Sequence, residues 1–250
     1  MRTVVARVAG LLAVALVLGG CTDGGEGAPT PTGDGTRASA SKTRDPAAVV
    51  SAAVDATTAA KSVVVGRTTQ DGDDWVQEEI EVSFAAPPSA RVLHVGEDIW
   101  TLDVVDGVGY LKDQSERKST NRWRRLSDTD TAAYLQELTP QSLLAALDAA
   151  ASVAEPAEET VREVPSTCHA FVLDPATAVA ADADEPGGEA STGSSAPASA
   201  SARLCVDSGS RPVELVVTVG ERVTTSVFSQ WGLALEAQPP PAGLVDDSGD

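Results

Sequence analysis

The sequence predicts an α+β fold in which an antiparallel β-sheet carries helices gathered on one of its faces. The first observation is the order of segments: a helical pattern, a run of alternating patterns, two more helical patterns and a second alternating run. The second is that all nine aromatic residues (Trp 4, Tyr 2, Phe 3) lie within residues 46–235, where a core would form. We therefore expect one folded domain over residues 46–235.

The composition argues against several classes of function. The chain has 250 residues, with 18 Lys and Arg against 37 Asp and Glu, and a formal net charge of −19. A nucleic-acid-binding surface needs a basic face to neutralise phosphates, so this balance argues against nucleic acid as a partner. With three Cys and two His, the chain has little material for a metal site, and we expect no metal and no cofactor.

The amino terminus has the pattern of an export signal. Arg2 and Arg7 precede an uncharged apolar run, 8–18, that is shorter than the roughly 20 residues of a transmembrane helix. The run ends in Leu-Gly-Gly-Cys, which is similar to a bacterial lipobox. We therefore expect a lipoprotein signal peptide over 1–20 and a diacylglycerol on Cys21, which would anchor the protein at the extracytoplasmic face of the cell membrane. The alternative is an ordinary secretory signal with an incidental cysteine.

Three segments hold too few apolar residues to fold. Residues 21–45 begin with the lipidated cysteine and continue in small and polar residues, which predicts a disordered tether. Residues 174–202 hold one Val and no Leu, Ile or aromatic residue, so we expect a disordered insertion within the domain. The Pro-rich, acidic tail 236–250 is expected to be extended and exposed.

Three segments have helical patterns. Asp45 and Pro46 suit the N-cap and the first position of a helix. Ser127 and Asp130 form a capping-box pattern before the second helix, and Thr139 precedes a proline at the start of the third. The apolar stripes of the three helices are Val50, Ala53, Val54 and Thr57; Tyr134, Leu135 and Leu138; and Leu143, Leu144 and Leu147.

The remaining segments alternate with the period of two that is typical of β-strands. In the second of them, Ile80, Val82 and Phe84 share one face while acidic and polar residues share the other. An Asp-Gly pair at 106–107 predicts a hairpin turn. The expected strands are 62–70, 75–84, 91–95, 99–105, 108–112, 161–164, 169–173, 203–206, 213–219 and 222–228.

Two cysteines remain after lipidation, one on each side of the predicted insertion. In an exported chain, Cys168 and Cys205 most simply form one disulfide, which would hold two neighbouring strands together. Closing this loop would stabilise the fold by up to roughly 4 kcal/mol. The alternative is a reactive Cys168 beside His169, which is disfavoured because the oxidising compartment offers Cys205 as a partner.

The sequence lacks three common catalytic motifs. It lacks G-x-S-x-G, H-E-x-x-H and P-loop patterns, so we expect no enzyme and no catalytic residues. His94 lies in an alternating segment, and we place it on the polar face of its strand. The acidic run 71–74 suggests calcium, but it lacks the position-12 Glu of a calcium loop, so a solvated turn is the favoured interpretation.

Five basic residues gather before the second helix: Arg117, Lys118, Arg122, Arg124 and Arg125. On an acidic protein, such a patch could contact anionic headgroups or the phosphate of a ligand, with Arg122, Arg124 and Arg125 as the contacts. The favoured alternative is a solvated face whose charge is balanced by nearby acidic residues.

Several short motifs follow one another in the order found in a known family. They are the lipobox, the polar tether, a helix that runs into Ala60-Lys61-Ser62-Val63-Val64, Gly107-Val108-Gly109-Tyr110 before Trp123, Leu138-Thr139-Pro140, Gly209-Ser210-Arg211-Pro212-Val213, and Ser229-Gln230-Trp231-Gly232 before Pro239-Pro240. In this order, they resemble the LppX/LprA/LprF/LprG-type lipoproteins of actinobacteria over most of residues 46–241.

This resemblance implies a fold and a function. The family is similar in fold to the LolA/LolB carriers, a curved antiparallel half-barrel with helices across its concave face. Its members carry acylated envelope lipids in a cavity between the sheet and the helices. The residues of this chain that we expect at such a cavity are Val82, Phe84, Trp100, Leu143, Leu147, Leu215 and Val217. The acidic insertion and the cysteine pair depart from the family pattern.

Two hypotheses for the function therefore stand. The first is a lipoprotein that binds or carries an acylated envelope lipid. The second is a non-enzymatic envelope interaction or sensor protein with the same fold, a packed core and no lipid ligand. The tryptophans at 75, 100, 123 and 231 fit both, because aromatic residues of a sheet line cavities but more often fill cores.

Overall fold

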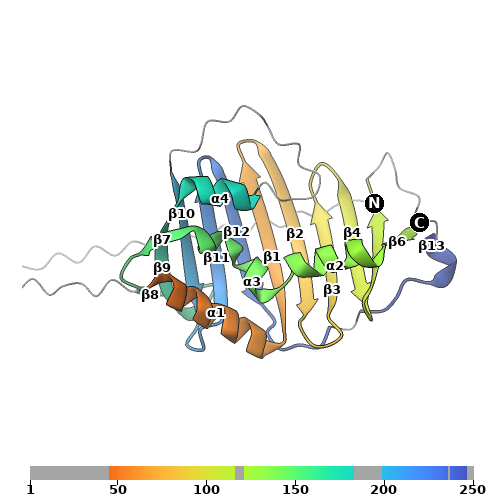
Figure 1. Ribbon diagram of the computed structural model, residues 1–250, viewed down its shortest axis with the longest axis horizontal. Coiled ribbons are helices and arrows are strands. Elements are labelled where there is room, and N and C mark those ends of the chain that lie inside the picture. Colours follow the sequence, from red (N-terminus) through yellow and green to blue (C-terminus); the bar gives the residue numbers. More distant parts are fainter. Residues whose placement is uncertain (1–44, 116–120, 183–198, 236, 247–250) are drawn as a thin grey trace, which may run out of the picture. The chain divides into compact units, whose positions relative to one another are not determined.

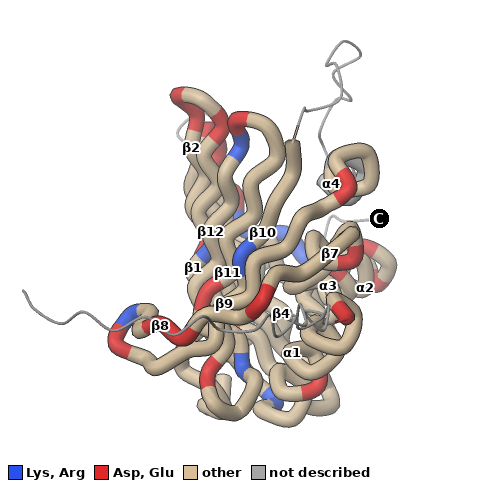
Figure 2. Tube along the Cα trace, turned by 90° about the vertical axis from the view of Figure 1, so that its left-hand side faces the viewer, with Lys and Arg blue, Asp and Glu red and all other residues tan. Residues whose placement is uncertain are grey.

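A computed structural model describes residues 45–115, 121–182, 199–235 and 237–246 (Figure 1). The predicted α+β class is confirmed. Within these residues, 13 strands form one curved, unclosed and mostly antiparallel sheet. The helices lie against one face of the sheet, which we call the concave face, and the opposite face is the convex face (Figures 1 and 2).

The strands and helices have the following bounds. The strands are β1 (Ser62–Asp71), β2 (Asp74–Ser83), β3 (Ser89–Val95), β4 (Ile99–Val105), β5 (Val108–Asp113), β6 (Trp123–Arg125), β7 (Ala150–Val153), β8 (Ala157–Val161), β9 (Val164–Leu173), β10 (Ala200–Val206), β11 (Pro212–Val219), β12 (Arg222–Ser229) and β13 (Val245–Asp246). The helices are α1 (Pro46–Ala60), α2 (Asp128–Glu137), α3 (Pro140–Leu143) and α4 (Pro175–Asp182), with 3₁₀ turns η1 (Ala145–Ala149) and η2 (Ala242–Leu244).

The sheet consists of two meanders joined at their ends. Its order is β13-β6-β5-β4-β3-β2-β1-β12-β11-β10-β9-β7, and β8 also pairs with β9. The first meander runs from β1 to β6, and the second from β9 to β12. Because β12 pairs antiparallel with β1, from Val64↔Ser229 to Gln70↔Val223, the two meanders share one continuous surface.

The first helix forms where the capping signals predict it. The Asp45 carboxylate accepts a hydrogen bond from the backbone N–H of Ala47 at 3.0 Å, and Pro46 occupies the first turn. Lys61 ends the helix in the left-handed region, with φ 66°. The predicted stripe faces the sheet: Val50, Ala53 and Thr57 are buried, and Val54 packs against the core.

The second helical region differs from its prediction in one respect. Ser127 and Thr139 accept the predicted capping hydrogen bonds, from the N–H groups of Asp130 and Ser142. The third helix, however, ends at Leu143, and the chain continues as the 3₁₀ turn η1. The predicted leucines of this segment are all buried, so the apolar pattern correctly predicted burial but not the helix length.

A glycine allows α2 to pack closely against the sheet. A Cβ on Gly109 of β5 would lie 2.6 Å from the Thr131 hydroxyl of α2 and 3.1 Å from Leu126. No side chain fits at that distance, so this position requires glycine.

Other predicted boundaries also change. The expected strand 161–164 is a hairpin turn between β8 and β9, because Arg162 and Glu163 have φ of 48° and 69°. Both ends of the insertion predicted over 174–202 are ordered: α4 occupies its start, with Ala178 buried, and β10 begins at Ala200. Residues 183–198 lie outside the described part of the chain. The tail forms β13, which pairs in parallel with β6 and extends the sheet beyond the predicted end of the domain.

Candidate functional site

The concave face is apolar where the helices cover it. Strand residues from the two meanders and residues of α1, α3 and η1 form one continuous cluster of buried side chains. One cross-strand row illustrates the packing. Val65 of β1 pairs with Ile80 of β2 and Phe228 of β12; Val92 of β3 pairs with Ile80 and with Leu102 of β4; all five are 5% exposed or less. We call these five residues the apolar row.

The residues predicted to line a ligand cavity lie together on this face. Val82, Leu143, Leu147 and Leu215 are buried members of the cluster, and Phe84, Trp100 and Val217 pack against it half-buried. The structure therefore brings together side chains that are up to 135 positions apart in the sequence (Val82 to Val217). Whether they enclose a ligand stays a prediction.

Beside the apolar row, the next row on the same face is polar. Arg67 pairs with Glu78 and Ser226, and His94 pairs with Glu78 and Trp100, each two residues along its strand from a member of the apolar row. We call Ser226, Arg67, Glu78, His94 and Trp100 the polar row.

The polar row is held together by side-chain contacts. Arg67 Nη1 lies 3.2 Å from Glu78 Oε2, and His94 Nδ1 lies 3.3 Å from Glu78 Oε1. The imidazole stacks on Trp100, with ring centroids 4.7 Å apart and planes 7° apart. The three charged or titratable side chains are 28%, 15% and 21% exposed, in the order Arg67, Glu78, His94, so water reaches each of them only in part.

The prediction that placed His94 on the polar face of its strand is wrong. It shares the concave face with Val92, because side chains two positions apart in a strand point the same way. The polar row was missed because Arg67, Glu78 and His94 belong to separate strands. The alternation of each strand reveals this row. Arg67, Glu78 and His94 each lie two positions along their strand from a buried apolar residue, so they point to the same face as that residue.

The polar row contacts the helix layer through an aromatic pair. Trp100 lies against Tyr134 of α2, with ring centroids 6.5 Å apart. Burial raises the pKa of the Tyr134 hydroxyl above its ordinary value, and the negative charge of Glu137 raises this pKa further. The phenol is therefore neutral at physiological pH and serves as an amphipathic contact.

Two small cavities lie outside the predicted cavity residues. One, of about 260 Å³, is lined by Ala48, Val49 and Ala52 of α1 together with His169, Val206 and Ser210. The other, of about 270 Å³, is lined by Arg124 and Leu126 with the α2 residues Asp130, Ala133, Tyr134 and Glu137.

The basic residues predicted as headgroup contacts are placed at the edge of the sheet. Arg122 forms an ion pair with Asp246 of β13, and this hydrogen-bonded contact raises the pKa of its guanidinium. Arg124 and Arg125 are exposed on β6, and Arg124 borders the second cavity. Arg117 and Lys118 lie outside the described residues, as does Cys21. The headgroup role of the three arginines stays a prediction.

The convex face carries the disulfide. Cys168 of β9 and Cys205 of β10 are paired across the strands and joined by a disulfide, with their Cα atoms 4.0 Å apart. Both are buried, at 4% and 0% exposure, in a small second cluster with Val161 and Val213.

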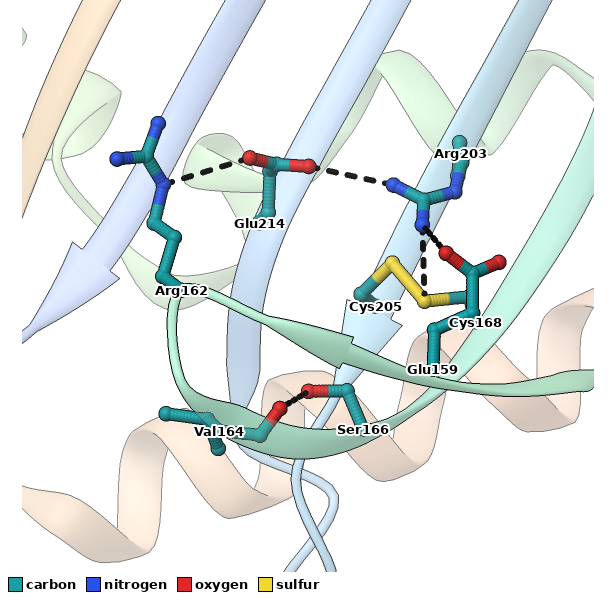
Figure 3. A network of polar contacts seen from close by, with 8 residues as sticks. All are labelled: Glu159, Arg162, Val164, Ser166, Cys168, Arg203, Cys205 and Glu214. Carbon is teal, nitrogen blue, oxygen red and sulfur yellow. Dashed lines mark hydrogen bonds and ion pairs between the residues drawn. A yellow bond between two sulfur atoms is a disulfide. The ribbon is translucent and has the colours of Figure 1, made fainter. Parts of the chain in front are cut away.

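A network of charged residues surrounds this disulfide (Figure 3). Arg203 of β10 contacts Glu214 of β11 at 3.2 Å, Glu159 of β8, and the sulfur of Cys168 at 3.3 Å. Arg162 contacts the other carboxylate oxygen of Glu214 at 3.4 Å. The predicted disulfide thus joins β9 and β10 under a layer of ion pairs that also ties β8 and β11 to them.

No helix within the described residues is long and apolar enough to cross a membrane. No group of His, Cys, Asp and Glu side chains in the same ranges is arranged to hold a metal ion.

Comparison with known proteins supports the resemblance at the level of fold. No family model matches the sequence, and a search of curated proteins found no match. Among solved structures, the lipoprotein LppX of Mycobacterium tuberculosis is 16% identical, with a TM-score of 0.53 over 78% of this chain and 100% of the other. LprF of Mycobacterium bovis is 12% identical, with a TM-score of 0.55 over 79% of this chain and 99% of the other. The half-barrel expected from the resemblance to these lipoproteins is confirmed.

Proposed function

We propose that this protein binds an acylated lipid between the concave face of its sheet and its helices, and that Cys21 anchors it to the extracytoplasmic face of the cell membrane. The carrier is tethered by its lipidated amino terminus, while the folded domain is free to meet the membrane surface. The fold shared with LppX and LprF supports this proposal.

One observation carries the proposal: one buried apolar cluster of the concave face joins strands of both meanders to the helices that cover it. The helices against it comprise α1, α2, α4 and the four-residue α3. The sheet is open, so these helices can separate from it without breaking strand pairing. Acyl chains that replace helix contacts would keep the same apolar surface away from water, at about 0.8 kcal/mol per methylene.

The direct test is native mass spectrometry of the full-length protein purified from its own envelope. We expect a bound acylated lipid in addition to the covalent anchor, released by organic extraction. Val217→Trp should reduce this bound lipid, because the larger ring occupies the space of the chain. Protein that carries no extractable lipid would contradict the proposal.

The continuity of the buried cluster favours the second function, an envelope interaction protein without a lipid ligand. In a fully packed core, Val217→Trp forces neighbouring side chains off their rotamers and costs about 1–3 kcal/mol. In a lipid-filled space, the same change displaces ligand and leaves the melting temperature of the lipid-free protein near that of the wild type. Thermal unfolding of lipid-free protein therefore separates the two functions.

A further inference from the structure

The concave face changes from apolar to charged between two neighbouring rows. The apolar row is 5% exposed or less, and the polar row beside it holds an ion pair and an imidazole on the same strands. Beyond the polar row, the face stays polar between β1 and β12, where the hydroxyls of Thr69 and Thr224 lie 3.1 Å apart. On β12 and on β1 to β4, the apolar surface thus has a limit along the direction of the strands. On β10 and β11 it continues through Ala202 and Val217.

We propose that the polar row sets the maximum length of an acyl chain that lies on β1 to β4 of the concave face. The inference rests on the proposed function. A chain that lies along β1 to β4 on the apolar surface ends at Arg67, Glu78 and His94. A methylene chain that crossed them would remove water from an ion pair and offer no hydrogen bond in return.

The charges of the row are arranged to oppose hydrocarbon rather than to attract a charged ligand. Arg67 and Glu78 neutralise each other, and Glu78 also holds the His94 ring against Trp100. Their side chains are 15–28% exposed, so each retains some water that a passing chain would displace. The polar row therefore disfavours binding of a hydrocarbon chain that crosses it, and does not disfavour a polar headgroup.

The spacing of the sheet gives the size of the effect. Two residues of an antiparallel strand span about 6.8 Å, which is the extended length of about five methylene groups. Replacing the charged members of the row with apolar side chains would therefore extend the apolar surface by about five carbons. Each carbon that becomes buried should improve the dissociation constant about fourfold.

The test measures the dissociation constants of the full-length protein for diacylglycerols whose saturated chains lengthen stepwise. For the wild type, affinity should rise with chain length and stop rising at a limit. In the variant Arg67→Met, Glu78→Met, His94→Leu, the rise should continue for about five more carbons. All partners are replaced together so that no charge is left buried alone.

Two matched variants control for general effects on stability. Arg91→Met with Asp103→Leu removes an ion pair of 2.8 Å between β3 and β4 on the convex face and should keep the wild-type limit. Exchange of the two charges, Arg67→Glu with Glu78→Arg, retains the ion pair and should also keep that limit. If the triple variant does not unfold cooperatively on heating, Arg67→Met with Glu78→Met replaces it.

Two outcomes contradict the inference in different ways. An apolar variant that binds diacylglycerols with the wild-type limit overturns the role of the polar row and leaves lipid binding intact. Wild-type protein that binds no diacylglycerol of any length overturns the inference together with the proposed function.

Discussion

The two faces of the sheet use ion pairs in opposite settings. On the convex face, the pair Arg91–Asp103 joins β3 to β4, and the network of Arg203 and Glu214 covers the disulfide. On the concave face, the pair of Arg67 and Glu78 lies next to the apolar row of buried Val, Ile, Leu and Phe. The difference teaches that the role of an ion pair on a β-sheet depends on the face it occupies. On the convex face, ion pairs join strands; on the concave face, the pair of Arg67 and Glu78 limits the apolar surface.

Deleting core side chains should give the largest effect and sharpen the contrast between the faces. Leu102 of the apolar row is 0% exposed, so Leu102→Ala should lower the free energy of unfolding by about 2–5 kcal/mol through the cavity it leaves. Leu93, on the convex face of the neighbouring strand, is 37% exposed, and Leu93→Ala should cost about 1 kcal/mol or less. Urea denaturation of both variants measures the difference, and equal losses would contradict the assignment of the faces.

Removing the disulfide of the convex face should give the second-largest loss of stability. The bond closes a loop with a sequence separation of 37 residues. Cys168→Ala with Cys205→Ala should lower the free energy of unfolding by about 2–4 kcal/mol, because the unfolded chain regains freedom. Reduced wild-type protein is the control and should lose a similar amount. A double variant with an unchanged denaturation midpoint would contradict a stabilising role of the disulfide.

A smaller, pH-dependent contribution to stability is expected at the turn between β10 and β11. Burial by itself raises the pKa of Asp207, but hydrogen bonds from the guanidinium and backbone N–H of Arg211 and the N–H of Gly209 hold this pKa below its ordinary value. Its contribution to stability is therefore complete above the pKa of the unfolded chain, near 3.9, and is lost as the pH falls through the lower folded-state pKa.

Asp207→Asn measures this contribution. At neutral pH, we expect the free energy of unfolding of the variant to be about 1–2 kcal/mol lower than that of the wild type, because the charge-assisted hydrogen bonds are lost. The difference from the wild type should shrink as the pH falls below about 4. Urea denaturation at several pH values tests this, and a difference that does not change with pH would contradict the role of the ionised carboxylate.

The sequence predicted most of the fold because its signals are local. The N-caps Asp45, Ser127 and Thr139 and the alternation of strands such as β2 depend on neighbours within a few positions. The disulfide was predictable because an exported chain with two cysteines left after lipidation has only one possible pairing within the chain. The turn at Arg162 and Glu163 was missed because neither Asn nor Gly marks it, although both residues have positive φ.

The candidate site was predictable only in its apolar half. The leucines and valines of the concave face follow from periodicity, together with the fold that the resemblance implies. The polar row depends on the register between β12, β1, β2, β3 and β4, and register joins residues up to 159 positions apart, from Arg67 to Ser226. Once the phase of alternation is followed through each strand, Arg67, Glu78 and His94 fall on the core side.

The central claim is that acyl chains lie on the concave face, and photo-crosslinking tests it most directly. A diacylglycerol with a diazirine within one chain would be bound to the full-length protein, irradiated and mapped by peptide mass spectrometry. The account predicts labels on concave residues such as Leu215 and Val217, and none on convex residues such as Leu93. Labels confined to the convex face, or the absence of labelling at concentrations that saturate binding, would contradict it.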